Sequence, residues 1–309
     1  MAGGVITTGS HPKLLWPGVK AVWGTVYDSW PTEYTDLFDT VSSEKNYEEY
    51  VQSSRFPLAQ VKPQGQPLVY ATEQQGQTVR LTNVTYAQGY AVTLEELQDN
   101  LYEKVSRMRA TNNAEGMRQT KEFVCANVYN RGFTSGYVGG DGVVLFSTAH
   151  PLIFGGTGSN TPAVGADLSE ISLEDAIIAM MGQVDDNGLT VRIMPRSLHI
   201  SRFEVMNAER ILKSVQQNDT ANNATNAIRS MGLLPGGAKV NHYFSNSTPA
   251  NWFLRASSRP GEGMIYQERM KIAFDQDNDF STKNALASAM ERYQVGWADW
   301  RYTYGVQGQ

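Results

Sequence analysis

Cysteine, long apolar runs and charge are all scarce in this sequence. Cys125 is the only cysteine among 309 residues, which excludes an internal disulfide and a cysteine metal cluster and predicts a reducing compartment. The longest uninterrupted apolar run, Ala176–Met181, is far shorter than the ~20 residues that span a bilayer. The first residues lack the basic start and apolar core of a signal peptide. We therefore expect no membrane association and no secretion.

Charged residues make up only 18% of the chain, and the formal net charge is -5. Domains that grip nucleic acid usually carry a basic face, so this balance predicts at most weak, non-specific contact with DNA. A hydrophobic fraction of 41% is enough for a real core in one large domain or two ordinary ones. Few charges and many glycines (28) suit a neutral surface that contacts other protein.

One segment, residues 93–131, has the periodicity of a long amphipathic helix. Thr93 and Glu96 form a capping box at its start, and Gly132 suits a C-terminal cap. An early apolar face consists of Leu94, Leu97, Leu101, Val105 and Met108. A later apolar set, roughly half a turn out of phase at ~3.6 residues per turn, consists of Met117, Phe123, Val124 and Val128. The pattern leaves two alternatives, a break at Asn112, Asn113 and Gly116 or a continuous helix that buries opposite faces.

The segments before this helix read as extended structure. Residues 1–54 contain prolines and many large aromatic side chains, and we interpret them as an extended arm with little helical character. The arm packs either on its own core or on a neighbouring subunit. In residues 55–90, Leu68–Thr72 and Thr78–Thr85 resemble strands of a glutamine-rich hairpin. Because this hairpin has few core-forming side chains, it needs support from outside itself, which favours a loop that lies on another subunit.

The rest of the chain predicts a mixed helix and sheet module followed by a return to strands. We expect helices from Ser172 onward and over Phe203–Ser214. We expect strands over Val143–Phe146, Thr190–Met194, Ser197–Ile200, Ala238–Phe244 and Trp252–Arg255, and extended structure at both ends of Met264–Tyr304, with Tyr293, Val295 and Trp297 alternating.

No catalytic, cofactor-binding or metal site emerges from the sequence. Cys125 and His150 could be imagined as nucleophile and base, but nothing marks a third group that orients them. The acidic run Asp275, Asp277 and Asp279 resembles the opening of a calcium loop but lacks its glycine and glutamate, so an acidic turn is the better interpretation.

The order of parts and several local motifs resemble the major capsid proteins of tailed bacteriophages, with the HK97-like fold, and more closely the Mu-like major head subunit family. The motifs are Val92-Thr93-Leu94-Glu95-Glu96-Leu97, Leu145-Phe146-Ser147-Thr148-Ala149-His150-Pro151, Asp277-Asn278-Asp279-Phe280-Ser281-Thr282 and Glu291-Arg292-Tyr293-Gln294-Val295-Gly296-Trp297 with Asp299-Trp300-Arg301. Each is weak alone, but together they cover the chain from about residue 45 to its end.

This resemblance implies an α+β fold divided into an N-terminal arm, an extended loop, a peripheral domain and an axial domain. The boundaries would be 1–54 for the arm, 55–90 for the extended loop, 91–164 for the peripheral domain with its spine helix 93–131, 165–260 for the axial domain, and 261–309 for the return to the peripheral sheet. The function implied is a capsid subunit, not an enzyme, that assembles into hexamers and pentamers of an icosahedral shell around double-stranded DNA. The virion would form in the cytoplasm of a bacterial host.

The resemblance also implies partners and contact residues. Expected partners are other copies of the chain, a portal at one vertex, decoration proteins, weakly held DNA, and a scaffolding protein that is separate because no charged helical segment precedes the arm. The residues we expect between subunits are Trp16, Trp23, Trp30, Lys62, Gln64, Gln74 and Gln75. We further predict that Asn112, Asn113 and Gly116 form a hinge that bends the spine helix in the immature shell, because interior glycine weakens a helix by about 1 kcal/mol relative to alanine.

Two other functions stay open at this point. An encapsulin-like compartment subunit would share the fold and enclose protein. A soluble enzyme would assemble its site from residues distant in sequence, and it would show a concave pocket with perturbed titratable groups.

Overall fold

The computed structural model describes residues 16–93, 95, 102–217, 224–245, 250–279, 281–282 and 284–309. Its helices are α1 (Trp16–Ser29), α2 (Tyr34–Leu37), α4 (Tyr102–Asn130), α5 (Glu170–Met181), α6 (Val205–Lys213) and α7 (Ala227–Met231), with the 3-10 turn η3 (Trp300–Tyr302). Its strands are β1 (Asp39–Ser42), β2 (Tyr47–Ser53), β3 (Gln75–Thr82), β4 (Val84–Val92), β5 (His150–Pro151), β6 (Thr157–Gly158), β7 (Pro195–Ile200), β8 (Ala238–Val240), β9 (Trp252–Ala256), β10 (Met264–Asn278), β11 (Ala285–Trp297) and β12 (Thr303–Val306). The predicted α+β class is confirmed.

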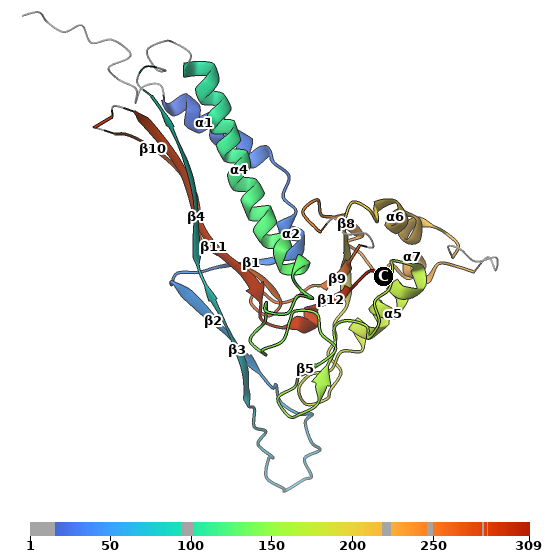
Figure 1. The fold of residues 1–309 in the computed structure, drawn as a ribbon. Coiled ribbons are helices and arrows are strands. Elements are labelled where there is room, and N and C mark those ends of the chain that lie inside the picture. Colours follow the sequence, from blue (N-terminus) through green and yellow to red (C-terminus); the bar gives the residue numbers. More distant parts are fainter. Residues whose placement is uncertain are drawn as a thin grey trace, which may run out of the picture.

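An elongated part of the molecule, which we call the long region, is built on the sheet β1-β10-β11-β4. The strands β10, β11 and β4 pair antiparallel, and β1 adds to β10 in parallel. Helix α4 runs along this sheet and α1 lies against α4 (Figure 1). The core between these elements comprises Trp23, Tyr27, Ala110, Ala114, Met117, Phe274, Ala287 and Ala289. Two helices and two long strands therefore brace one another along the length of the molecule.

A second part, which we call the compact region, is built on the sheet β12-β9-β7-β8 with α5, α6 and α7 around it (Figure 1). Its core contains Leu173, Ile177, Leu198, Leu254 and Trp252, each less than 3% exposed. The helix α5 begins at a capping box in which the Ser169 hydroxyl accepts from the Ser172 amide and the Ser172 hydroxyl accepts from the Ser169 amide. Ser172 was expected to be the cap itself, so the prediction placed the helix start three residues too late.

Helix α4 is continuous from Tyr102 to Asn130, so the alternative of a break at Asn112, Asn113 and Gly116 is wrong. The continuous alternative also needs correction, because Met108 and Phe123, which were assigned to its apolar faces, are exposed by 57% and 51%. One buried face continues instead through Ala110, Ala114, Met117, Arg118, Lys121, Glu122, Cys125, Ala126 and Tyr129. The change of phase arose because three of these buried positions hold charged side chains, which a hydrophobic pattern counts as surface. The start at Thr93 and Glu96 lies partly outside the described residues.

The N-terminal segment is helical where an extended arm was expected. Residues Trp16–Ser29 form α1, with Pro17 in its first turn, where the missing N–H of proline does no harm. Trp23 and Tyr27, one helical turn apart, stack with ring centroids 5.2 Å apart and pack on the long region. Tertiary packing therefore stabilises a helix that contains two glycines and several β-branched residues.

The predicted strands have mixed outcomes. Ser197–Ile200 and Trp252–Arg255 are confirmed as β7 and β9, Phe203–Ser214 as α6, and the period-two segment around Tyr293 as β11. Ala238–Phe244 contains the shorter β8, whereas Leu68–Thr72 is not a strand, and Val143–Phe146 and Thr190–Met194 contain only single bridges. The expected hairpin exists with a different first strand, because β3 pairs antiparallel with β2 from the segment assigned to the arm.

Candidate subunit interface

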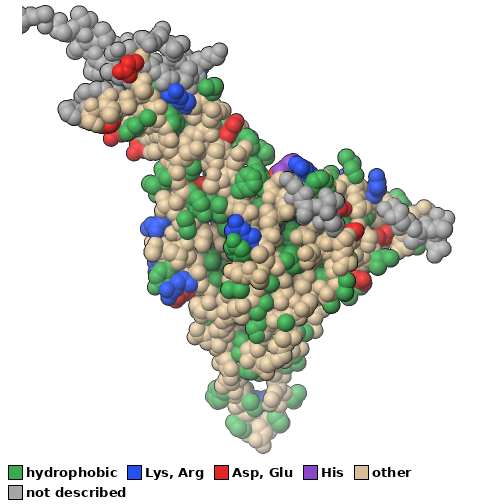
Figure 2. All heavy atoms as spheres, viewed as in Figure 1, with side chains coloured by type: hydrophobic (Ala, Val, Ile, Leu, Met, Phe, Trp, Pro, Cys, Tyr) green, Lys and Arg blue, Asp and Glu red, His purple; other side chains and the backbone are tan. Residues whose placement is uncertain are grey.

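The loop between β2 and β3 projects from the molecule. Every residue from 55 to 75 is exposed, and Figure 1 shows this loop at the end of the β2-β3 hairpin, beyond the other elements. Its apolar side chains are Phe56, Leu58, Val61, Leu68, Val69 and Tyr70, which are 58–93% exposed. Figure 2 shows them as green atoms at the lower tip. Contiguous exposed apolar side chains mark a surface that binds a partner.

Four of the predicted contact residues belong to this loop. Lys62 and Gln64 lie in its exposed outer part, and Gln74 and Gln75 lie where it returns to β3. The Gln74 amide donates to the Ser54 hydroxyl (2.9 Å) and its carbonyl accepts from the Ser54 amide (2.9 Å), so the two chains of the loop meet there. The apolar residues beside these glutamines were missed as a contact surface. The sequence does carry a signal for this surface, because these apolar residues stand in a segment whose apolar positions follow neither the helical nor the strand period.

The three tryptophans among the predicted contact residues lie outside this loop, in α1 and directly after it. Trp23 is 4% exposed, stacks on Phe274 at 5.1 Å and donates from Nε1 to Oδ1 of Asn113 at 2.9 Å. The ring of Trp23 is therefore enclosed by its own chain, and its contact with a neighbouring subunit stays a prediction. Trp30 is half-buried, and Trp16 begins α1 with its side chain outside the described part.

The predicted hinge residues differ in environment. Asn112 is exposed, whereas Asn113 is buried and donates from Nδ2 to the carbonyl of Gln88 on β4 at 3.1 Å. A Cβ atom at Gly116 would lie 2.7 Å from Oε1 of Gln88. Asn113 and Gly116 therefore sit at a polar contact between α4, α1 and β4, which gives both residues a packing role in this conformation.

A buried ionic cluster joins α1, α4 and β11 next to this contact. Lys121 Nζ lies 2.6 Å from Oε2 of Glu291, with side-chain exposures of 5% and 1%, and it donates to the Tyr27 hydroxyl at 2.9 Å. Burial opposes charge on Lys121, but the Glu291 carboxylate and the Tyr27 hydroxyl outweigh it and raise the Lys121 pKa. Arg118 lies over the Tyr27 ring at 4.6 Å. Charges enclosed in this way hold α1 to the spine in one geometry.

Glu122, also on α4, holds the start of α2. Its carboxylate oxygens accept from the backbone amides of Glu33 (3.2 Å) and Tyr34 (2.9 Å). Burial raises the pKa of Glu122 to about 7, although both hydrogen bonds act to lower it. The Glu122 carboxylate therefore titrates near neutral pH, but it contacts backbone amides and does not line a cleft, so its role is structural.

The residues that could suggest catalysis have structural roles. Asn160 directs its Nδ2 at the carbonyls of Leu145, Trp300 and Thr303, so its Oδ1 accepts from Nε2 of His150 at 3.1 Å. Nδ1 of His150 lies 2.6 Å from Asp141, and the ring stacks on Trp300 at 4.2 Å. Burial raises the pKa of the Cys125 thiol well above its ordinary value, which keeps it a poor nucleophile.

Other candidate sites are likewise accounted for by local structure. Asp279 accepts from the hydroxyls of Ser281 and Thr282 in the turn after β10, and these bonds lower its pKa to about 2. This is the acidic turn that was expected. Burial and nearby cations lower the pKa of His199 to about 3. Within the described ranges no group of three metal-ligating side chains converges, and no helix is long and apolar enough to cross a membrane.

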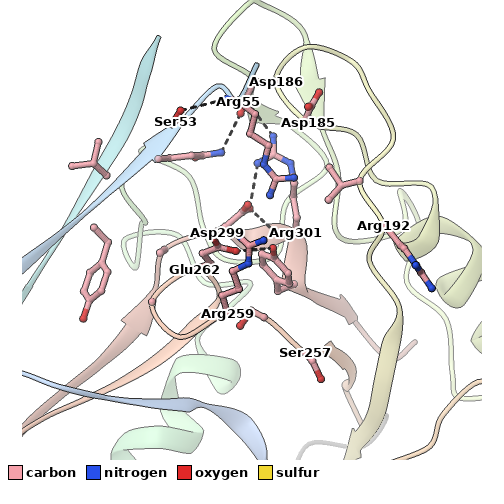
Figure 3. Close-up of a pocket in the computed structure, with 18 of the residues that line it drawn as sticks. Ser53, Arg55, Asp185, Asp186, Arg192, Ser257, Arg259, Glu262, Asp299 and Arg301 are labelled. Atoms are coloured by element: carbon pink, nitrogen blue, oxygen red, sulfur yellow. Dashed lines mark hydrogen bonds and ion pairs between the residues drawn. The ribbon is translucent and has the colours of Figure 1, made fainter. Parts of the chain in front are cut away.

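A groove of about 940 Å³ lies at the root of the projecting loop. It is bordered by β2, by the turn after α5 and by residues around η3 (Figure 3). Its floor is an ionic network in which Arg301 contacts Asp186 at 3.3 Å and Asp299 at 3.2 Å and donates to the Val184 carbonyl at 2.8 Å. Asp186 and Asp299 are paired with Arg301, and Asp185 accepts from the backbone amides of Asn187 and Leu189, so the groove is a structural junction and not a catalytic cleft.

Comparison with known proteins agrees with this picture of a structural subunit. Residues 76–306 match a family model described as phage capsid protein. The structure is similar to that of a virus-like particle from Pyrococcus furiosus, with a TM-score of 0.53 and 9% identity over 94% of this chain and 98% of the other. It is similar to the capsid of the cyanophage P-SCSP1u, with a TM-score of 0.54 and 8% identity, and to the capsid of Ralstonia phage GP4, with 0.54 and 10%, each covering 90% of this chain and 88% of the other. At such identities the likeness concerns the fold. No protein with a curated description matches this sequence.

Proposed function

The chain belongs to the phage capsid protein family, whose model its residues 76–306 match, and we propose that it is a major head subunit of the Mu-like type. Its fold is the HK97-like capsid fold. It is a structural component of the virion and not an enzyme. In the proposal, copies of the chain form hexamers and pentamers that close into the icosahedral shell of a tailed phage around double-stranded DNA.

The loop 55–75 is the observation that carries this proposal. Its apolar side chains have no cover in their own subunit, so they are buried only when a neighbouring copy lies beneath them. A loop that leaves one subunit and lies on a different surface of the next makes a heterologous contact, and such contacts close into rings. Burial of large area against several neighbours then stabilises segments that are unsupported alone.

We assign the long region, with α4 as the spine helix, to the peripheral domain, and the compact region to the axial domain. The predicted boundaries, 91–164 and 261–309 for the peripheral domain and 165–260 for the axial domain, fit this assignment except at three strands: β1 and β4 belong to the sheet of the long region, and β12 to the sheet of the compact region. The axial domain meets its copies at the fivefold and sixfold axes. Exposed apolar side chains of the compact region support the second contact, namely Ile171, Ile178, Met206 and Met231, which are 67–71% exposed. The loop 55–90 overlies a neighbour, and residues 1–54 are the N-terminal arm, whose helix α1 packs on α4.

The other partners in the proposal are a separate scaffolding protein, a portal at one vertex and decoration proteins on the shell. Contact with the packaged DNA is weak and non-specific. The chain's formal charge of -5 supports this point, because affinity for the phosphate backbone comes mainly from lysine and arginine. Weak contact also lets the genome leave the shell again.

Electron microscopy of the chain produced alone and with the neighbouring phage genes tests the proposal. We expect closed shells tens of nanometres across. The matched control is a chain in which residues 57–72 are replaced by a short glycine and serine linker. It should fold and fail to close shells. Small uniform particles from the unaltered chain under both conditions would contradict the proposal.

A compartment subunit that encloses protein is the second candidate, because the fold is shared with a virus-like particle from Pyrococcus furiosus. The family match favours the phage capsid. The content of purified shells separates the two functions. Shells filled in the presence of the phage packaging genes should contain double-stranded DNA, whereas a compartment would contain a protein cargo.

A further inference from the structure

The hairpin β2-β3, which carries the projecting loop, is fastened to the body of the subunit at both of its ends. At the end near the peripheral sheet, Gln267 of β10 is fully buried and donates to the Leu81 carbonyl (3.2 Å) and to Oδ1 of Asn83 (2.8 Å). Its Oε1 accepts from the Tyr50 hydroxyl at 3.1 Å. Since Val79 and Leu81 also pack on Ile265, this end of the hairpin is a fixed pivot.

The other end, where the loop begins, is held by the turn that follows α5 (Figure 3). Asn187 donates from Nδ2 to the carbonyls of Ser54 (2.7 Å) and Arg55 (3.3 Å). Gln52 donates from Nε2 to Oδ2 of Asp186 at 3.2 Å. The turn itself is preshaped, because Oδ1 of Asp185 accepts from the backbone amide of Asn187 at 2.9 Å.

The two fastenings differ in how easily they can open. The pivot is enclosed, whereas the contact at Asn187 is half-exposed and borders the groove of about 940 Å³, which gives the hairpin room to move. Arg55 has φ of +62°, a left-handed conformation that costs free energy in a residue with a side chain. The hydrogen bond to its carbonyl keeps Arg55 in this conformation, and its release would relax the backbone.

We propose that the turn 185–188 is a latch, with Asn187 as its positioning residue, that sets the direction of the loop from the axial domain. Residues 55–75 are all exposed, and beyond the latch and the Ser54–Gln74 hydrogen bonds no described part of the subunit covers the loop and fixes where it points. A rotation of the compact region relative to the long region either carries the loop along or opens the latch. The direction of the loop, and through it the position of the neighbour, is thus coupled to the axial domain.

Proteolysis of the full-length, unassembled subunit tests the latch without any shell. Trypsin cleaves after Arg55, at the latch, and chymotrypsin cleaves after Tyr70, which is 88% exposed in the outer loop and serves as an internal reference. Asn187→Asp keeps the side-chain shape but replaces the donor with a carboxylate that faces two carbonyls. We expect cleavage after Arg55 to become about tenfold faster or more, with cleavage after Tyr70 unchanged.

Asn284→Asp is the matched control, because it makes the same charge change in the turn after β10, where the asparagine side chain makes no hydrogen bond with the described residues. Equal rates after Arg55 in the two variants would overturn the latch. If Asn187→Asp unfolds the subunit, cleavage accelerates at every site and this variant no longer tests the latch. Gln52→Ala then serves as the test, because it removes the hydrogen bond to Asp186 from the hairpin side. It should accelerate cleavage after Arg55 and leave cleavage after Tyr70 unchanged.

The consequence for assembly rests on the proposed function. Asn187→Asp subunits should form shells with a wider spread of diameters than Asn284→Asp subunits, because their loops approach the neighbour from variable directions. If the two variants and the unaltered chain all fail to form shells, the capsid proposal fails. The latch is still tested independently by the proteolysis of the unassembled subunit.

Discussion

The face of α4 that lies on the sheet β1-β10-β11-β4 and the loop 55–75 distribute charge and apolar surface in opposite ways. Helix α4 buries Arg118, Lys121 and Glu122, each less than 8% exposed, inside its own subunit. The loop exposes Val61, Val69 and Tyr70 by 93%, 71% and 88%. The usual arrangement, apolar inside and charged outside, is therefore inverted in both places.

The difference indicates where each segment obtains its stability. The charged groups of α4 have partners inside the subunit: Lys121 pairs with Glu291, Arg118 lies over the Tyr27 ring, and Glu122 accepts from backbone amides. In the proposed function, the loop is completed only by another copy. Substitutions on α4 should therefore change the stability of the isolated subunit, and substitutions in the loop should change assembly alone.

The largest effect is expected from Lys121→Met, which leaves Glu291 buried without its cation. Removal of one partner from a buried ion pair destabilises a protein by about 3–5 kcal/mol. We expect a loss of that size in the free energy of unfolding, measured by chemical denaturation of the unassembled subunit.

The control is Lys213→Met, which breaks a pair with Glu209 whose side chains are 74% and 56% exposed. It should change stability by less than about 0.5 kcal/mol. The double variant Lys121→Met with Glu291→Leu should recover most of the loss, because no charge then remains unpaired. A loss in Lys121→Met no larger than in the control would show that the buried pair does not brace the spine.

A second test uses pH and Glu122. Burial raises its pKa from 4.5 to about 7 in the folded chain, so the folded state holds this proton where the unfolded state has released it. Its contribution therefore favours the folded state at low pH and is lost as pH rises from about 4.5 through about 7. Relative to Glu122→Gln, the unaltered subunit should lose about 2 kcal/mol of unfolding free energy between pH 5 and pH 8.

The comparison with Glu122→Gln isolates this group from His199, whose lowered pKa of about 3 acts in the opposite direction below pH 6.5. Glutamine still accepts one of the two backbone amides that Glu122 holds. Parallel stability profiles for the two proteins from pH 5 to 8 would rule out a Glu122 that titrates near neutrality.

Much of the architecture follows from local pattern. The course of β11 could be predicted because Tyr293, Val295 and Trp297 alternate, α6 because its apolar residues follow the helical period, and β9 because it is a short, mostly apolar run. The helix α1 could not, since its stability comes from Trp23 and Tyr27 against residues more than eighty positions away. The break suggested within α4 had the same origin, because Lys121 and Glu122 are buried by partners that only the fold brings near.

The candidate interface divides in the same way. The loop was predicted as an intersubunit segment because its glutamines could not form a core, and the structure leaves Lys62, Gln64, Gln74 and Gln75 exposed. The latch could not be predicted, because Asn187 and Ser54 are 133 residues apart and hydrogen bonds between side chain and backbone leave no periodic signal.

On the loop side of the comparison, Val69→Asp should leave the isolated subunit unchanged and weaken assembly. Val69 is 71% exposed, so we expect a change in unfolding free energy within about 0.5 kcal/mol. A charge in a contact that becomes buried should raise the concentration needed for assembly about tenfold, equivalent to about 1.4 kcal/mol. Light scattering during assembly measures this, with Glu73→Asp as a conservative control in the same loop.

The smallest effect sharpens the comparison within α4 itself. Gly116→Ala should stabilise the isolated subunit by about 0.5–1 kcal/mol, because alanine favours the helix and the added Cβ meets only the end of the Gln88 side chain, which can rotate away. If Asn112, Asn113 and Gly116 also form the hinge we propose, the same change should slow expansion of the shell, since a stiffer helix resists bending.

The pair Gly116→Ala and Gln88→Ala separates the two roles, because Gln88→Ala removes the contact at Gly116 and leaves the helix backbone as it was. Expansion followed by electron microscopy over time should slow in Gly116→Ala and not in Gln88→Ala. Unchanged kinetics in a stabilised Gly116→Ala shell would mean that this glycine serves only the close approach of β4 to the spine.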